Sequence, residues 1–287
     1  MKNYTIKKVN KDFIFLTDVM INKGTREKRL AYDVKKKEKA MFKYQKYQCT
    51  EACSEKLSYE IAKVLNYHCA RIEFAKDEEG TLGVLNYMFA DENNGQHTDA
   101  VAYLNNNGNR KDFYTIENIQ KCLNRIDINL FNDFLKIMIF DALVGETDRH
   151  EENWGILYKD GKYEVSPLYD NGCNLLRELN NEKLMTYLNE ENDSFERYIN
   201  RSRTLIYNSE NNRRYTHFEL IKKLYLQNKE EMKKQLKILK LITDKKIEKI
   251  VNKIPNELMS DIHKQCVMKY LIIRREKLLK IIENENI

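Results

Sequence analysis

The chain has 287 residues, of which 42% are hydrophobic and 33% are charged, so it can bury the core of one large domain or of two lobes. The 50 basic and 44 acidic residues leave a net charge of +6, which argues against a strong nucleic-acid binder and suits the phosphates of a small ligand. No run of eighteen apolar residues occurs, so no membrane span is expected.

The amino terminus and the cysteines predict a cytoplasmic protein. Residues 1–13 lack the apolar core of a signal peptide. The six cysteines are scattered along the chain, and their spacing fits neither a disulfide scaffold nor a zinc site, which is typical of a reducing compartment. Export by a route without a signal peptide stays open.

The first part of the chain predicts a small β-rich lobe with one helix. Residues 51–67 carry Leu57, Ile61 and Leu65 at helical spacing, which predicts a helix with one apolar stripe. Short runs rich in aromatic and aliphatic residues predict strands at 13–19, 28–34, 39–44, 70–76 and 81–89.

A larger, mainly helical lobe is predicted for the rest of the chain. Residues 90–113 are polar and rich in Asn and Gly, which predicts a linker, and we place the lobes at 1–90 and 91–287. The run at 129–144 is apolar almost all round, which is typical of a helix in the middle of a lobe. The predicted fold is therefore α+β, with two lobes and a cleft of the kind in which ligands bind.

A charged stretch at residues 145–172, interrupted by a predicted hairpin, follows that apolar run. Asp148 and Asn153 are five residues apart, and Asp170 comes after the hairpin. Protein kinases have an Asp and an Asn at this interval in the catalytic loop, and a metal-binding Asp after a hairpin. Phosphoryl transfer needs a carboxylate that orients the acceptor and oxygen ligands for Mg²⁺. The pattern predicts Asp148 as that carboxylate, and Asn153 and Asp170 as the Mg²⁺ ligands.

Phosphoryl transfer also needs a cation on the nucleotide phosphates. Lys43 lies in a predicted strand between aromatic neighbours, where a lysine is unusual unless it contacts an anion. Its partner on the following helix is either Glu55 or Glu60. On a helical wheel Glu60 lies about 60° from Leu57, at the edge of the apolar stripe, whereas Glu55 lies near the opposite side. The sequence does not decide which of the two glutamates pairs with Lys43.

The remaining nucleotide contacts are predicted in two segments. The sequence has no G-x-G-x-x-G loop, and Gly24 with Thr25 provides the flexible segment whose backbone amides can hold phosphate. The adenine is expected against the backbone where the last strand of the small lobe meets the linker, at Tyr87, Met88 and Phe89. The predicted cofactors are ATP and Mg²⁺.

Two segments resemble a known family. T-D-R-H-E-E-N-W-G-I-L at 147–157 and S-P-L-Y-D-N-G at 166–172 resemble the signature of HipA-like serine/threonine kinases, within the phosphatidylinositol 3/4-kinase-like branch of the kinase fold. K-G-T-R-E-K-R, F-K-Y and S-E-K-L-S-Y-E-I-A-K-V-L are similar to the compact CtkA-type members. The resemblance covers roughly residues 20–180 and is strongest over 141–172.

The resemblance implies a two-lobed protein-kinase-like fold and an ATP-dependent serine/threonine protein kinase that phosphorylates itself. It implies Asp148 as the catalytic base, Asn153 and Asp170 as the Mg²⁺ ligands, and Lys43 as the phosphate contact. For the partner of Lys43 it favours Glu55. Longer members carry an amino-terminal module used in toxin–antitoxin assemblies, for which residues 1–20 are too short.

The implied partners are ATP, a protein substrate with a Ser or Thr acceptor, and a regulatory protein. Acceptors in the chain itself would be Thr25, Ser54 or Ser202. His150 is either a packing residue beneath the loop or a second base, as in lipid kinases of the same branch.

Three alternatives to a serine/threonine kinase stay open. One is a kinase that acts on a lipid or a small molecule, and another is an inactive kinase fold that serves as a binding module. The third is a metal-dependent hydrolase built on Asp148, His150 and Asp170, which would leave Lys43 without a role.

Overall fold

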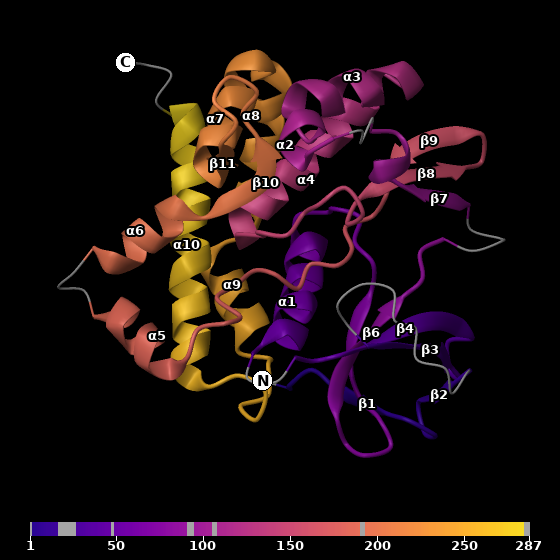
Figure 1. Ribbon diagram of the computed structural model, residues 1–287. Helices are drawn as coiled ribbons and strands as arrows, with labels where there is room; N and C mark the ends of the chain where they lie inside the picture. The colour runs from indigo at the N-terminus through magenta and orange to yellow at the C-terminus, as the bar shows by residue number, and fades with distance from the viewer. Residues whose placement is uncertain are drawn as a thin grey trace.

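A computed structural model describes residues 2–16, 27–46, 49–90, 95–104, 108–189 and 193–283. It shows a two-lobed α+β fold, in which a curled sheet lies at the lower right of Figure 1 and a larger helical lobe lies above and to the left. Helix α1 lies between the two parts (Figure 1).

The small lobe is a six-stranded sheet with the strand order β1-β5-β6-β4-β3-β2. β1 pairs with β5 in parallel, and the other neighbours are antiparallel. The strands and the helix of this lobe are β1 (Ile6–Lys8), β2 (Phe13–Phe15), β3 (Lys28–Asp33), β4 (Glu38–Tyr44), α1 (Glu51–Val64), β5 (Ile72–Lys76) and β6 (Leu82–Tyr87).

The two faces of this sheet have different surroundings because side chains alternate along each strand. Phe42 of β4 lies opposite Leu85 of β6, and both belong to a small core on the outer face that also includes Tyr87. Lys43 lies opposite Val84, on the face that meets the main core. The register therefore directs Lys43 towards α1 and the second lobe.

Helix α1 is buried on most of its sides, since it packs against β5, β6 and α9. It ends in a Schellman motif, in which Asn66 has a positive φ of 58°. The Tyr67 amide donates to the Ala62 carbonyl (2.9 Å) and the Asn66 amide donates to the Lys63 carbonyl (3.2 Å). This turn sends the chain back towards the sheet and places Tyr67 against the second lobe.

The second lobe is built around α4, which is buried almost along its whole length and packs against α3, α7, α8 and α10. A three-stranded sheet, β7-β8-β9, and a two-stranded sheet, β10-β11, complete it. Its elements are β7 (Gln96–Asp99), η1 (Ala100–Ala102), α2 (Arg110–Phe113), α3 (Ile116–Ile126), α4 (Leu130–Val144), β8 (Gly155–Lys159), β9 (Lys162–Val165), α5 (Asn181–Leu188), α6 (Ser194–Arg201), β10 (Arg203–Tyr207), β11 (Arg214–Thr216), α7 (His217–Gln227), α8 (Lys229–Ile238), η2 (Leu239–Leu241), α9 (Asp244–Val251) and α10 (Asp261–Glu283).

Strands β1, β7, β10 and β11 lie where the sequence pattern predicted none. β1 has only three residues, and β7 falls inside the predicted linker. Both are edge strands, whose backbone bonds to β5 and β8 hold them although their side chains are polar or half-exposed. Among the helices of the described residues, none is both long and apolar enough to cross a bilayer.

Candidate active site

Lys43, Glu55 and Asp170 meet where the two lobes face each other. The Lys43 ammonium lies 2.5 Å from Glu55 Oε1 and 2.5 Å from Asp170 Oδ1. The other oxygen of Glu55 accepts the backbone amide of Asn171 at 3.2 Å. One buried glutamate thus holds both the strand lysine and the backbone of the loop that carries Asp170.

Burial and charge act against each other in this cluster. Burial disfavours the charge of Lys43, but Asp170 and Glu55 outweigh it and raise the pKa of the ammonium. Partial burial also opposes the charge of Asp170, but Lys43 outweighs it and lowers the pKa of that carboxyl. Burial raises the pKa of Glu55 in spite of the nearby ammonium. Lys43 and Asp170 therefore form an ion pair at neutral pH.

Glu55, not Glu60, is the partner of Lys43. Glu60 lies 2.8 Å from Lys56 and 3.2 Å from Lys63, all three on the same helix. The helical wheel favoured Glu60 because it treated the apolar stripe as the only buried side of α1. Both lobes cover this helix, so the side of Glu55 is buried as well, with 1% of the residue exposed.

The loop that carries Asp148 and Asn153 begins where α4 ends. Gly145 has a positive φ of 73°, and a Cβ atom there would overlap the Tyr270 hydroxyl, so a glycine is needed. Asp148 follows with an exposed side chain, whose Oδ2 lies 3.6 Å from the Cys173 sulfur. The Asn153 side-chain amide donates to the Asp148 carbonyl at 2.8 Å, which leaves the Asn153 side-chain oxygen for another ligand.

Arg149 is a buried residue of this region that the sequence pattern did not single out. Its guanidinium binds both oxygens of Asp141 on α4, at 2.8 and 3.1 Å. Nη1 donates to the backbone carbonyls of Asn153 (2.9 Å) and Tyr169 (2.8 Å), and Nη2 donates to the Asn171 side chain (2.6 Å). One buried cation therefore joins the loop of Asn153 to the loop of Asp170. Asp141 on the apolar helix was the available signal, because a buried carboxylate needs a cation.

Glu146 supports the same two loops from behind. Its Oε1 accepts the Asp148 amide at 2.9 Å, and its Oε2 accepts the Cys173 amide at 3.2 Å and the Asn174 side chain at 3.1 Å. Burial raises the pKa of this carboxyl to about 7, although Arg149 opposes the shift. Backbone amides on either side of the site are thus held by one carboxylate.

The residues predicted for adenine lie at the end of β6. Tyr87 points to the outer face of the sheet, where its hydroxyl donates to Asp33 at 2.5 Å. The amide of Met88 is already bound to the Lys39 carbonyl at 3.1 Å. The Phe89 ring packs against the Tyr169 ring with centroids 5.5 Å apart, beside Asp170.

The remaining predicted site residues are His150, Gly24 and Thr25. His150 is half-buried, and its Nδ1 accepts the Glu152 amide at 3.2 Å, within its own turn. Gly24 and Thr25 lie outside the described residues. In the part of the chain that is described, no three His, Cys, Asp or Glu side chains gather as a metal-binding group.

The donor set fits Mg²⁺ and nucleotide phosphates. Mg²⁺ prefers a few protein oxygens and completes its shell with phosphates and water, and the Asp170 carboxylate with the Asn153 oxygen provides such a set. Lys43 is a fixed cation beside Asp170. The cavity that Lys43, Glu55 and Val84 line encloses only about 10 Å³.

Similar solved structures include two from bacteria. The crystal structure of the proinflammatory kinase CtkA of Helicobacter pylori is similar, with a TM-score of 0.79 at 17% identity over 94% of this chain and 95% of that one. HipA of Shewanella oneidensis, in a toxin–antitoxin complex with HipB and operator DNA, is similar with a TM-score of 0.62 at 12% identity over 94% of this chain and 68% of that one. At these identities the likeness concerns the fold.

Sequence comparison points to the same family. Over 150 residues the chain is 25% identical to the serine/threonine-protein kinase CtkA of H. pylori, an alignment that covers 52% of this chain and 45% of that protein. The chain thus matches about half the length of this curated relative. The family model described as HipA-like C-terminal domain matches residues 21–262, which is most of the sequence. The chain belongs to the family of HipA-like C-terminal domains.

Proposed function

We propose that the protein is an ATP- and Mg²⁺-dependent kinase that phosphorylates Ser or Thr hydroxyls of a protein. The observation that carries the proposal is the cluster of Lys43, Glu55 and Asp170, which Arg149 ties to the loop of Asp148. The name of the sequence relative as a serine/threonine-protein kinase supports the choice of acceptor. We further propose residues 1–90 as the nucleotide-binding lobe and 91–287 as the catalytic lobe.

Each residue of the cluster has a distinct task in this proposal. Lys43, oriented by Glu55, binds nucleotide phosphates, and Asp170 with Asn153 holds Mg²⁺. Asp148 accepts the proton of the acceptor hydroxyl, because its side chain is exposed. When bound, Mg²⁺ offsets the negative charge of the phosphates. Arg149 and Glu146 position these groups without contacting the substrate.

The structure narrows the acceptors that the chain itself offers. Ser54 is fully buried in α1, where its hydroxyl donates to the Asn174 carbonyl at 3.0 Å, so it is not an acceptor in the folded protein. Ser202 is half-buried at the end of α6. Thr25 lies outside the described residues. Ser202 is therefore the better candidate among the described acceptors for phosphorylation of the chain by itself.

The test is incubation of the purified protein with Mg²⁺ and radiolabelled ATP, with a mixture of proteins and inositol lipids as acceptors. We expect label on Ser or Thr of protein, confirmed by the mass of one phosphoryl group on a peptide. The Asp148→Asn variant is the matched control and should transfer none above background. Label on lipid alone would assign the lipid-kinase alternative, and ATP binding without any transfer would assign the inactive binding module.

Replacing Glu55 should impair the kinase, whereas replacing Glu60 should not. Glu55→Gln removes the buried carboxylate that holds Lys43 and the Asn171 amide, so we expect kcat/KM for ATP to fall about 10²–10³-fold, the range for loss of one preorganised charge contact. Lys43→Ala should lower kcat/KM for ATP at least as much. Glu60→Gln is the matched control on the same helix. Equal rates for Glu55→Gln and Glu60→Gln would contradict the assigned role of Glu55.

A further inference from the structure

A groove of about 390 Å³ lies where the amino-terminal ends of α1, α5 and α10 come together, in the lower part of Figure 1. Gln45, which follows β4, lines this groove and also the small cavity beside Lys43 and Glu55. The groove therefore adjoins the place at which nucleotide phosphates are proposed to bind.

The wall of the groove is connected to Asp148 through one short segment. Cys173 and Arg177 are four positions apart, and the Cys173 sulfur lies 3.6 Å from Asp148 Oδ2. Arg177 lines the groove, and its carbonyl accepts the amide of Thr50, another groove residue, at 3.0 Å. Four residues span at most about 14 Å. A polypeptide whose hydroxyl lies at Asp148 thus reaches the groove within about four residues.

Four side-chain amides in the wall use their oxygens within the protein. At the start of α5, the Asn180 oxygen accepts the backbone amide of Lys183 at 3.0 Å. Beside α1, the Gln45 oxygen accepts the backbone amide of Ala52 at 3.3 Å. Because a backbone amide only donates, these bonds identify the oxygen of each side chain and leave its NH₂ group on the other side.

The two other amides, those of Asn181 and Asn256, are held in the same way. The Asn256 oxygen accepts the Lys264 ammonium, which only donates. The Asn181 oxygen accepts the Ser260 hydroxyl at 2.9 Å, and the Ser260 oxygen in turn accepts the His263 amide at 3.2 Å. The oxygens of all four side chains are therefore occupied.

The four NH₂ groups are left for a ligand. Within the described part of the chain, none of them has a hydrogen-bond partner. Asn180, Asn181 and Asn256 are exposed and Gln45 is half-buried, so a bound molecule can reach them. Each NH₂ group carries two donors. The groove is thus suited to a ligand that is rich in acceptor oxygens.

The charges in the wall argue against an anionic ligand. Arg177 is already paired with Glu178 at 3.0 Å and lies 3.8 Å from Glu51. Burial lowers the pKa of His263, so this ring is neutral at neutral pH. Glu257 adds a carboxylate, which repels anions and accepts hydrogen bonds. A polypeptide backbone matches this wall, because its carbonyls accept from the amides and its NH groups donate to the carboxylate.

We propose that the groove binds an extended segment of the protein substrate through its backbone. The four side-chain NH₂ groups donate to carbonyls of the segment, and Glu257 accepts one of its amides. Recognition of this kind selects an unfolded or loop segment as the substrate and does not depend on its side chains. The inference rests on the proposed kinase function and names the class of substrate for that site.

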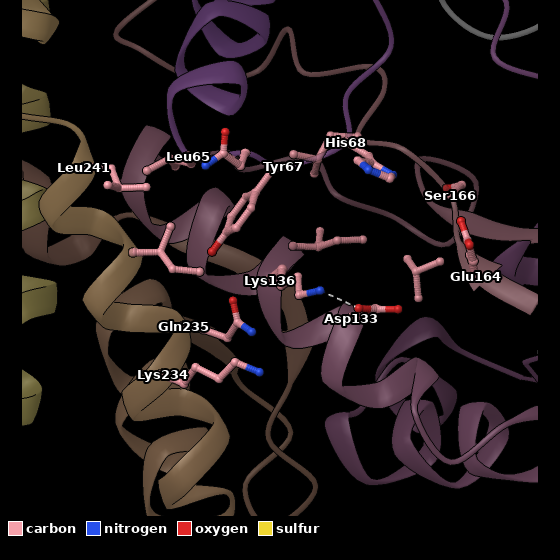
Figure 2. A pocket seen from close by; sticks show the side chains of 15 residues that line it. Leu65, Tyr67, His68, Asp133, Lys136, Glu164, Ser166, Lys234, Gln235 and Leu241 are labelled. Carbon is pink, nitrogen blue, oxygen red and sulfur yellow. Dashed lines mark hydrogen bonds and ion pairs between the residues drawn. The ribbon is translucent and has the colours of Figure 1, made fainter.

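A larger cavity at the opposite end of α1 provides a control. It measures about 510 Å³, and Figure 2 shows Lys136 paired with Asp133 in its wall. Among the described residues, its lining and that of the groove have no member in common. The exposed Asn66 lies in this second wall, and an aspartate tolerates its positive φ of 58° as an asparagine does.

The test measures KM for dephosphorylated casein, an unfolded polypeptide, and KM for ATP in matched variants. Asn180→Asp and Asn256→Asp keep the bonded oxygens and replace a donor by an acceptor, so the fold should be retained. We expect each to raise KM for casein about tenfold, and KM for ATP should not follow. Asn66→Asp adds the same charge outside the groove and should leave KM for casein at the wild-type value.

Asn180→Ser separates loss of the donor from the added charge. Serine keeps an oxygen that caps α5, removes the NH₂ group and adds no charge, so KM for casein should rise about threefold. A melting curve checks the fold of each variant. A wild-type KM for casein in Asn180→Ser, or an equal rise in Asn66→Asp, would overturn the proposal. Label on the chain itself without any on casein would also overturn it, whereas no transfer to any protein would contradict the kinase function as well.

Discussion

Asp148→Asn is expected to bind Mg²⁺-ATP like the wild-type protein and to lose phosphoryl transfer by about 10²–10⁴-fold, the range for loss of a general base. The substitution keeps the size of the side chain and removes its charge. Because the Asp148 carboxylate is exposed and its contact within the protein is the Cys173 thiol, the fold should not change. Single-turnover transfer from radiolabelled ATP measures the rate.

Asp170→Asn should fail in a different way. This variant loses a charged Mg²⁺ ligand and the partner of Lys43, so Mg²⁺-dependent nucleotide binding itself should weaken. Nucleotide at about 100-fold over its dissociation constant stabilises a protein by roughly 2.7 kcal/mol, which raises the melting temperature by several degrees. The wild-type protein and Asp148→Asn should show that rise, and Asp170→Asn should show much less. An equal rise of the melting temperature in all three proteins would show that Asp170 is not a Mg²⁺ ligand. A small rise in Asp148→Asn with a full rise in Asp170→Asn would show that the roles of the two aspartates are reversed.

Arg149→Met is expected to lower the free energy of unfolding by about 3–5 kcal/mol, as when one partner of a buried ion pair is removed. Asp141 would stay buried without a counter-charge, and the carbonyls of Asn153 and Tyr169 would lose their donor. Urea denaturation measures the change. Arg197→Met is the matched control, because Arg197 is 57% exposed and lies 4.0 Å from Asp193, and it should cost less than about 1 kcal/mol.

A double variant separates the two roles of Arg149. Asp141→Leu removes the carboxylate that Arg149→Met leaves without a partner, so the pair of substitutions should restore part of the lost stability. Phosphoryl transfer should stay low in the double variant, because the guanidinium that bonds the Asn153 and Tyr169 carbonyls is still absent. Wild-type stability of Arg149→Met, or recovery of transfer in the double variant, would show that this guanidinium does not position the site.

The local pattern was enough to predict the fold class and most strands of the small lobe. Apolar and aromatic runs mark β3, β4, β5 and β6 because these strands bury side chains on at least one face. β7 could not be predicted in this way, since it consists of polar residues and exists because β8 offers a free edge. The pairing of β1 with β5 has the same origin. An edge strand is held by its neighbour's backbone, and the sequence of the strand itself does not encode that neighbour.

The spacing of Asp148, Asn153 and Asp170 predicts a phosphoryl-transfer site from the sequence alone, because it matches the interval of the corresponding residues in protein kinases. The position of Lys43 in a predicted strand indicated that this lysine contacts an anion. Its ion pairs with Glu55 and Asp170 join residues that are 12 and 127 positions apart in the sequence. The contact between Lys43 and Asp170 exists because the two lobes pack together.

What the sequence by itself determined is therefore the set of chemical groups, and the tertiary structure decided which of them meet. Burial of α1 from both lobes selects Glu55 over Glu60, which no periodicity within one helix can show. The bonds of Arg149 to both loops likewise depend on segments that are distant in the chain. Burial and hydrogen-bond partnership are properties of the packed molecule, because each depends on the other elements that surround a side chain.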